Sequence, residues 1–306
     1  MNKLYAVALM GATGTGKSAL ALSVAKQSGN MIISCDSMQL YRGLDIGTAT
    51  PTAAELATVK HAMVNCCELP DYYSAARWAD EARVVIRQQN ALGKTPLIVG
   101  GTGLYLRALI EGLADIPPED ATIRARFESM HWIDGIKPLY HLLQQRDPVI
   151  AAQLKEADSQ RILRALVVQE STGIPLSTWQ QRPSNVEIVH CPIFVLDLAR
   201  EILRQRMADR FMQMMEDGWL HEVRWLASVG LADTHPAMRA VGYRHLLDHL
   251  LERCSLEEAV QKGITATRRY GKRQVTWFMH QTPSAIHGDG EQLRALIAKA
   301  LGPRKE

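Results

Sequence analysis

Short apolar runs alternate along this chain with longer stretches whose apolar residues recur at helical spacing. Each run has the length of a strand that is buried on both faces, as strands of parallel sheets are. The runs span residues 4–10, 31–35, 96–99 and 192–198, with a weaker one at 61–67. The stretches 19–27 and 74–92 are predicted helices. This alternation predicts an α/β fold with helices flanking a parallel sheet, whose last strand is 192–198.

Proline-containing segments interrupt this alternation at two places. They span residues 114–120 and 181–185, and the chain between them has helical periodicity without a convincing strand. We therefore predict an all-helical insertion over residues 118–183, placed within a core domain that consists of residues 1–117 and 184–306.

The composition is that of a globular protein. The chain has 306 residues, 47% of them hydrophobic, which is enough for a large core with an added unit. Its five cysteines show neither paired secretory spacing nor a C-x-x-C motif, which favours reduced thiols in the cytosol. Because no apolar segment approaches the length of a membrane span, we expect a cytoplasmic protein without a membrane partner. The net charge of +3 suggests a polyanionic partner only if the basic residues cluster.

The first apolar run ends in a glycine-rich loop. Gly11, Gly16, Lys17 and Ser18 satisfy the phosphate-binding pattern G-x-x-x-x-G-K-[ST] between a predicted strand and a predicted helix. Such a loop lets backbone N–H groups converge on one anion, Lys17 adds a charge, and the Ser18 hydroxyl can ligate Mg²⁺. The predicted cradle consists of Gly11, Ala12, Thr13, Gly14, Thr15, Gly16, Lys17 and Ser18. The motif indicates a polyphosphate without identifying it, and a glycine-rich turn without a ligand is the alternative.

A carboxylate follows the second apolar run. A parallel sheet would place Asp36 and the three residues after it at the same edge as the phosphate loop. There Asp36 could act as a general base, or it could simply cap a turn. The third run ends in Gly100–Gly103, where ordinary P-loop NTPases carry a Mg²⁺-binding Asp. We therefore expect backbone groups and the Thr102 hydroxyl near the phosphates, without standard nucleotide hydrolysis; a plain strand-to-helix turn is the alternative.

Basic residues cluster on several predicted helices. Arg161 and Arg164 share a face within the insertion, and Arg206 and Arg210 could face the phosphate edge or pair with acidic neighbours. A last helix, starting at a capping box made by Ser255 and Glu258, carries a mixture of basic and aromatic side chains. Its members are Arg268, Arg269, Lys272, Arg273, Trp277 and Phe278. Such a helix can bind nucleic acid, but a basic amphipathic helix docked on its own core has the same pattern.

Seven sequence blocks, taken in order, resemble the tRNA dimethylallyltransferase family, also called tRNA isopentenyltransferases. They are GATGTGKS, DSMQLYRGLDIGTATP, GGTGLYLRALIEG, DSQRILRALVV, RFMQMMEDGWLHEV, AVGYR and ATRRYGKRQVTWF. The second and last blocks are much more specific than the phosphate loop. The chain departs from the family pattern at Ala12, where the family usually has proline, and at Met279, where many members have arginine.

The resemblance implies a P-loop NTPase-like sheet with a helical tRNA-binding insertion. It also implies transfer of a dimethylallyl group from dimethylallyl diphosphate to N6 of adenosine 37, next to the tRNA anticodon, with Mg²⁺ as cofactor. Lys17 and Arg210 would stabilise the leaving diphosphate, and Ser18 would ligate the metal. Thr102 would bond the bridging oxygen, while Asp36 would accept a proton from the attacking amine.

The resemblance further implies which residues contact tRNA. The adenine would have to leave its stack to reach the site. The implied contacts are Asp36, Ser37, Met38, Gln39, Thr102, Arg124, Gln160, Arg161, Ile162, Leu163, Arg164, Arg239, Gly242, Tyr243, Arg244, Lys272, Arg273, Gln274, Thr276 and Trp277. We expect a monomer whose partners are the tRNA anticodon stem-loop and dimethylallyl diphosphate. An ATP-dependent small-molecule kinase and a nucleotide-gated RNA-binding module are the alternative functions.

Overall fold

The computed structural model describes residues 3–182 and 186–302, which form two compact units. The core unit lies within residues 1–110 and 187–306, and the insertion unit comprises residues 111–186. The predicted insertion, 118–183, falls within the second unit, although its last residue lies outside the described residues.

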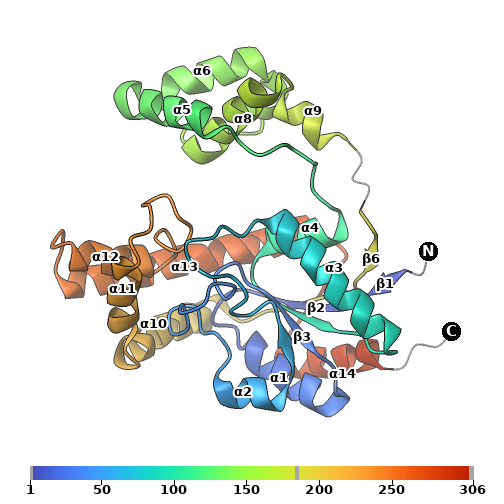
Figure 1. The fold of residues 1–306 in the computed structure, drawn as a ribbon. Helices are drawn as coiled ribbons and strands as arrows, with labels where there is room; N and C mark the ends of the chain where they lie inside the picture. Colours follow the sequence, from blue (N-terminus) through green and yellow to red (C-terminus); the bar gives the residue numbers. More distant parts are fainter. Residues whose placement is uncertain (1–2, 183–185, 303–306) are drawn as a thin grey trace. The chain divides into compact units, whose positions relative to one another are not determined.

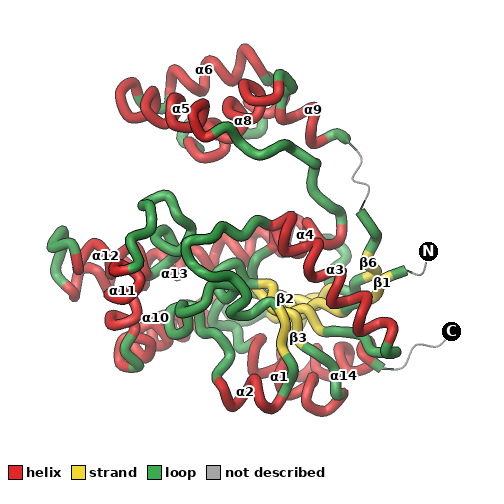
Figure 2. Tube along the Cα trace, viewed as in Figure 1, coloured by secondary structure: helices red, strands yellow, loops and turns green. Residues whose placement is uncertain are grey.

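The described part of the core unit contains a parallel sheet, of which Figures 1 and 2 label β2 and β3. Its six strands have the order β4-β3-β5-β2-β7-β8. Its strands are β2 (Val7–Met10), β3 (Ile32–Cys35), β4 (His61–Ala62), β5 (Leu97–Gly100), β7 (Ile193–Leu196) and β8 (Ile286–Gly288). The central four are the apolar runs that the sequence identifies. They are buried because neighbouring strands and helices cover both edges and both faces. The predicted α/β fold is therefore confirmed.

Two predictions about strands need correction. The first apolar run is divided at Ala6, so that β1 (Leu4–Tyr5) pairs with β6 (Val189–His190) in a separate two-stranded sheet. The run 192–198 is not the last strand, because β8 pairs with β7 at the edge. β8 is short and partly exposed, and it therefore lacks the continuous apolar pattern of a central strand.

Helices cover both faces of the sheet (Figure 1). The helices of the core unit are α1 (Lys17–Ser28), α2 (Ala53–Thr58), α3 (Ala75–Ala91), α4 (Gly103–Ile110), α10 (Arg200–Glu216), α11 (Trp219–Ser228), α12 (Tyr243–Leu250), α13 (Leu256–Gln281) and α14 (Gly290–Leu301). The Ser255–Glu258 capping box at the start of α13 is present as predicted. Among the described residues, no helix is both long and apolar enough to cross a membrane.

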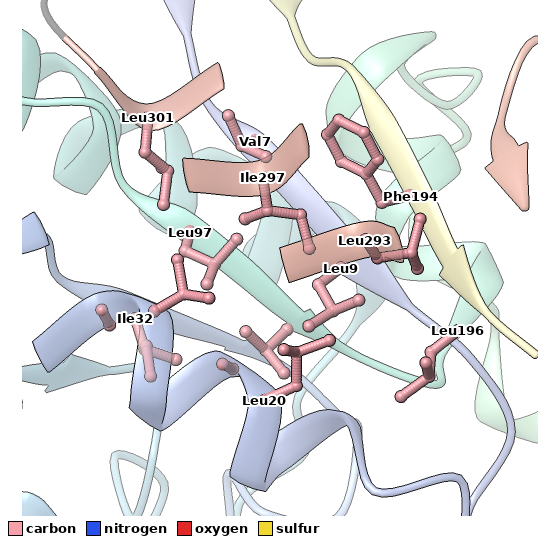
Figure 3. Packing of buried hydrophobic residues seen from close by; sticks show 14 of the residues in the cluster. Val7, Leu9, Leu20, Ile32, Leu97, Phe194, Leu196, Leu293, Ile297 and Leu301 are labelled. Atoms are coloured by element: carbon pink, nitrogen blue, oxygen red, sulfur yellow. The ribbon is translucent and has the colours of Figure 1, made fainter. Parts of the chain in front are cut away.

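The main core lies between the sheet and the helices α1 and α14. Leu9 of β2 is fully buried there, together with Leu20 of α1 and with Leu293 and Ile297 of α14 (Figure 3). Apolar burial of this extent contributes about 25 cal/mol for each Å² removed from water. The last helix of the chain thus completes the core that begins with the first long strand.

The insertion unit is helical in its described part. It contains α5 (Ala121–Asp134), α6 (Lys137–Arg146), α7 (Pro148–Ala151), α8 (Ser159–Thr172) and α9 (Leu176–Gln180). Phe127 of α5, Leu143 of α6 and Leu166 of α8 meet in a separate hydrophobic core. The unit therefore has the independent core that is typical of a domain.

We expect Leu293→Ala to lower the free energy of unfolding by about 2–5 kcal/mol, because the truncation leaves a cavity in the main core. Urea unfolding measures the change. Leu296→Ala is the matched control, since Leu296 lies on the same helix and is 41% exposed. Equal losses from the two variants would contradict the position of α14 on the sheet.

Candidate active site

The loop between β2 and α1 has the backbone that an anion-binding loop requires. Gly14 and Gly16 adopt φ values of 84° and 94°, which residues with a side chain rarely adopt. The Thr15 hydroxyl donates to the Ala12 carbonyl at 2.9 Å and closes the loop. Lys17 begins α1, and its Nζ also donates to the Ala12 carbonyl, at 3.3 Å. The loop thus presents backbone N–H groups and an ammonium at the positive end of a helix.

Lys17 is held in an environment that disfavours its charge. The pKa of Lys17 is lowered to about 8, chiefly by burial; the negative charge of Asp36 acts in the opposite direction, and the positive charge of Arg210 acts with burial. A polyphosphate beside the ammonium would favour the charged form, since opposite charges interact strongly where water is excluded. The loop is therefore electrostatically suited to an anionic ligand.

Asp36 follows β3 at the same edge of the sheet as the phosphate loop, as the sequence predicts. Its Oδ1 accepts a hydrogen bond from the backbone N–H of Met38 at 2.9 Å, which holds the carboxylate in a local turn. The side-chain amide of Gln39 forms hydrogen bonds within the protein. It accepts a hydrogen bond from the Ser34 hydroxyl at 2.8 Å and donates one to the Ala49 carbonyl at 3.0 Å. Ser37 and Met38, but not Gln39, line the smaller of the two cavities described below.

Close packing against β3 explains why β5 ends in a glycine, without a side chain. A β-carbon on Gly100 would lie 2.0 Å from the carbonyl oxygen of Cys35, so an aspartate cannot replace this glycine without moving the backbone. Thr102 follows two residues later. Its hydroxyl accepts the Ser37 N–H at 3.1 Å, and its own N–H donates to the Cys35 carbonyl at 3.1 Å. Thr102 therefore joins the end of β5 to the Asp36 turn.

Two cavities meet at Lys17, Asp36 and Arg210. The larger, of about 870 Å³, extends along the phosphate loop past Ser18. The smaller, of about 280 Å³, continues to aromatic side chains from the four helices α10, α11, α12 and α13. The aromatic side chains that line it are Phe211, Trp219, Tyr243 and Tyr270. The three charged side chains thus lie at the junction of a space with phosphate-binding backbone and a space with aromatic walls.

Arg210 reaches this junction from α10. Burial lowers the pKa of its guanidinium, while the negative charge of Asp36 acts in the opposite direction. Within the described part of the chain, Arg210 forms no ion pair. Its neighbour Asp209 instead accepts a hydrogen bond from Gln205. Of the two alternatives that the sequence left open for Arg210, the structure favours the phosphate edge.

Glu222 of α11 holds the loop that forms one wall of both cavities, a role that the sequence analysis missed. Its carboxylate accepts the backbone N–H groups of Asp45, Ile46 and Gly47 at 2.8, 2.7 and 3.1 Å. It also accepts the Tyr243 hydroxyl at 2.6 Å. The three loop N–H groups lie at least 175 residues from Glu222 in sequence, so no local pattern reveals their contact.

Residues 239–244 divide into a buried part and an exposed part. Tyr243 is buried, and Gly242 leaves room for the Trp219 ring, since a β-carbon there would approach it to 2.0 Å. Arg239 and Arg244 are exposed. The side chain of Tyr243 is therefore part of the loop support, and the two arginines remain accessible to a partner.

The last long helix, α13, also has two kinds of predicted contact residue. Lys272, Arg273 and Thr276 are exposed, whereas Trp277 packs beside Gly103. Gln274 is buried, with 6% of its surface exposed, and contacts two loops of the site. Helix α13 is thus both a docked structural helix and a basic surface.

Most of the residues predicted to contact tRNA in the insertion unit already interact with other residues of that unit. Arg124 and Arg164 both pair with Glu119, and Arg161 pairs with Asp158 at 3.0 Å. Gln160 is exposed. The side chains of Ile162 and Leu163 lie in the core of the unit, so the implied tRNA contact at these two positions can involve only their backbone.

Comparisons with known proteins agree on one family. The model of the family described as IPP transferase matches residues 39–281. The chain is 40% identical to a tRNA dimethylallyltransferase of Halorhodospira halophila over 94% of each chain. It is 32% identical to a solved tRNA isopentenylpyrophosphate transferase of Bacillus halodurans, with a TM-score of 0.70 over 98% of this chain and 97% of the other. A eukaryotic dimethylallyltransferase acting on tRNA, 24% identical, shares the fold with a TM-score of 0.77 over 100% of this chain and 82% of the other.

We expect the affinity for inorganic diphosphate to fall as the pH rises above about 8, where Lys17 loses its proton in the free protein. The decrease can reach about tenfold per pH unit, because binding then requires proton uptake. Calorimetry from pH 7 to 9.5 measures it. Lys17→Arg is the control, since a guanidinium stays charged and the ligand's own ionisation cancels in the ratio. Parallel pH profiles would rule out Lys17 as the titrating group.

Glu222→Gln should destabilise the loop 45–47. The two carboxylate oxygens accept the three loop N–H groups and the Tyr243 hydroxyl, whereas an amide has only one acceptor oxygen for these donors. We expect a loss of about 1–3 kcal/mol in the free energy of unfolding. Thermal or urea unfolding measures this loss. Glu216→Gln, at an exposed position of α10, serves as the control. If both variants unfold like the unmodified protein, the carboxylate does not hold the loop.

Proposed function

This chain belongs to the IPP transferase family, and from this premise we propose that it is a tRNA dimethylallyltransferase. It transfers the dimethylallyl group of dimethylallyl diphosphate to N6 of adenosine 37, the nucleotide 3′ to the anticodon, and releases diphosphate. The observation that carries the proposal is the meeting of the two cavities at Lys17, Asp36 and Arg210. A phosphate-binding space and an aromatic-walled space, joined at a carboxylate, suit the transfer of a group from a diphosphate to a base.

The diphosphate occupies the larger cavity in this proposal. When the allylic C–O bond breaks, positive charge develops on carbon and negative charge on the diphosphate, so that preorganised positive groups lower the barrier. The loop N–H groups, Lys17 and Arg210 supply these groups. Thr102 keeps its hydroxyl proton while accepting from Ser37, and it can donate that proton to the bridging oxygen.

The residues present fit a magnesium ion that takes most of its ligands from the substrate and from water. Ser18 lines the larger cavity beside the phosphate loop and offers its hydroxyl as a ligand. Among the described residues, no group of three or more His, Cys, Asp or Glu side chains could hold a metal by itself. This small donor set suits Mg²⁺, which is usually bound by one or two protein oxygens together with phosphates. When bound, the ion supplies positive charge to the diphosphate.

The adenine enters the smaller cavity. A base within a stacked loop cannot reach a carboxylate that lies inside a cavity, so the nucleotide must be extruded and held between apolar or aromatic side chains. Phe211 and Tyr270 line this cavity together with Ser37 and Met38. Asp36 accepts a proton from the exocyclic amine as its nitrogen attacks the allylic carbon.

The tRNA contacts exposed basic residues of both units. In the core unit these are Arg239, Arg244, Lys272 and Arg273, and in the insertion unit Arg161 has the most exposed side chain of the three predicted arginines. We further propose that the protein acts in the cytoplasm, where it meets tRNA, and as a monomer, because both cavities are formed within one chain.

Incubation of the purified protein with unmodified tRNA, Mg²⁺ and labelled dimethylallyl diphosphate tests the function. Nucleoside analysis should show label on adenosine 37 as N6-(dimethylallyl)adenosine. Phosphoryl transfer from ATP to a small molecule, without labelling of tRNA, would instead identify a kinase. tRNA binding that responds to nucleotides but not to the isoprenoid would indicate an RNA-binding module.

Asp36→Asn should slow the transfer step by about 10²- to 10⁴-fold, the usual effect of losing a positioned base. The amide keeps the oxygen that accepts the Met38 N–H, so that the turn is preserved. Single-turnover kinetics measures the rate, and equilibrium binding of diphosphate and tRNA serves as the control. Turnover within a few-fold of the unmodified enzyme would remove the proposed role.

Charge reversal at Lys272 and Arg273 should weaken tRNA binding and reduce its dependence on salt. Each phosphate contact that is lost lowers the slope of log affinity against log salt by about 1. Reversal of the exposed Lys26 and Lys299, on α1 and α14, is the control for net charge. A salt slope equal to that of this control would mean that α13 does not contact tRNA.

A further inference from the structure

Gln274 is the buried residue in the middle of the exposed basic segment of α13. Its side-chain Oε1 accepts the backbone N–H of Thr13 in the phosphate loop at 2.9 Å. Its Nε2 donates to the backbone carbonyl of Gly101, after β5, also at 2.9 Å. One carboxamide therefore joins two loops that lie 261 and 173 residues away in sequence.

The chemistry of these two contacts calls for a primary amide and a neighbouring glycine. A carboxylate at position 274 could accept from Thr13 but could not donate to Gly101, and an ammonium could do only the reverse. A β-carbon on Gly101 would lie 2.2 Å from Nε2 of Gln274, so any larger residue there must displace the amide. Gly101 and Gln274 therefore form one mutually dependent contact.

We infer that Gln274 is a positioning residue for the diphosphate, acting through the backbone of the phosphate loop rather than through tRNA. This inference rests on the proposed function, because it assumes that the loop binds diphosphate. Thr13 and Gly14 line both cavities, and the N–H groups of the loop bind an anion well only if they are held in place beforehand. The same amide holds Gly101, next to Thr102, whose hydroxyl accepts the N–H beside Asp36. Gln274 thus keeps the phosphate loop and the Asp36 turn in a fixed relation.

This role and the tRNA contact implied by the sequence resemblance lead to opposite results. A positioning residue of the loop should affect diphosphate affinity when no tRNA is present. A tRNA contact should affect tRNA affinity when no diphosphate is present. Both affinities can be measured separately on the full-length protein, with inorganic diphosphate and Mg²⁺ as one probe and unmodified tRNA as the other.

Gln274→Ala should weaken diphosphate binding about tenfold, which corresponds to about 1.4 kcal/mol, and should leave tRNA affinity within about twofold. Retained tRNA binding also shows that the variant is folded. Gln261→Ala is the matched control, because Gln261 is exposed on the same helix. Unchanged diphosphate affinity, or a loss confined to tRNA, would overturn the inference.

A double-variant cycle tests the contact itself. Gly101→Ala should weaken diphosphate binding to a similar degree, because the new methyl group displaces the amide. Combining Gly101→Ala with Gln274→Ala should add little, since the contact is already lost and the truncated side chain leaves room. Additive losses would show that the two positions act independently and would overturn the inference. If the unmodified protein itself does not bind diphosphate, the proposed function fails; normal binding with unaffected variants refutes the inference alone.

Discussion

The site depends on charges that are partly withdrawn from water at one edge of the parallel sheet. Burial lowers the pKa of Lys17 to about 8, and Asp36 and Arg210 act on it in opposite directions. A buried cation loses hydration, which costs free energy. An anionic ligand that enters this space contacts the cation directly and thereby offsets that loss. The proposed diphosphate would therefore supply the negative charge that stabilises the ammonium of Lys17 in this space. Hydrogen bonds to the phosphate loop and within the Asp36 turn hold two of these charges, those of Lys17 and Asp36, at their positions.

Helices from the carboxyl-terminal half of the core unit hold those loops, and glycines make the close approach possible. A β-carbon on Gly47 would lie 2.1 Å from Trp219 of α11, and one on Gly103 would lie 2.3 Å from Trp277 of α13. At both places a large side chain packs directly on backbone, which leaves little freedom for the loop. Gly47 and Gly103 are therefore explained by the side chains that pack on them, whereas Gly14 and Gly16 of the phosphate loop are explained by their positive φ values.

The parts of the structure that could be predicted from the sequence are those that depend on neighbouring residues. The phosphate loop and the placement of Asp36 follow from a short motif and from the rule that parallel strands end at one edge. The roles of Glu222 and Gln274 could not be predicted, because each joins segments more than 170 residues apart. The edge strand β8 was missed for another reason, since a short and half-exposed strand has no continuous apolar run. The sequence thus predicts the residues of the local motifs, but not the distant residues that hold those motifs in place.

The basic residues of the insertion unit and those of α13 differ in whether they already form ion pairs. Arg124 and Arg164 of the insertion unit already pair with Glu119, so a tRNA phosphate there competes with an existing ion pair. Within the described residues, Lys272 and Arg273 have no such acidic partner, although Arg273 lies 5.7 Å from the ring of Tyr270. In the proposed function, binding at α13 would release counterions without breaking an ion pair, which would make it the larger source of electrostatic affinity. A phosphate that displaced Glu119 would contribute less affinity, because the ion pairs of Glu119 with Arg124 and Arg164 must first break.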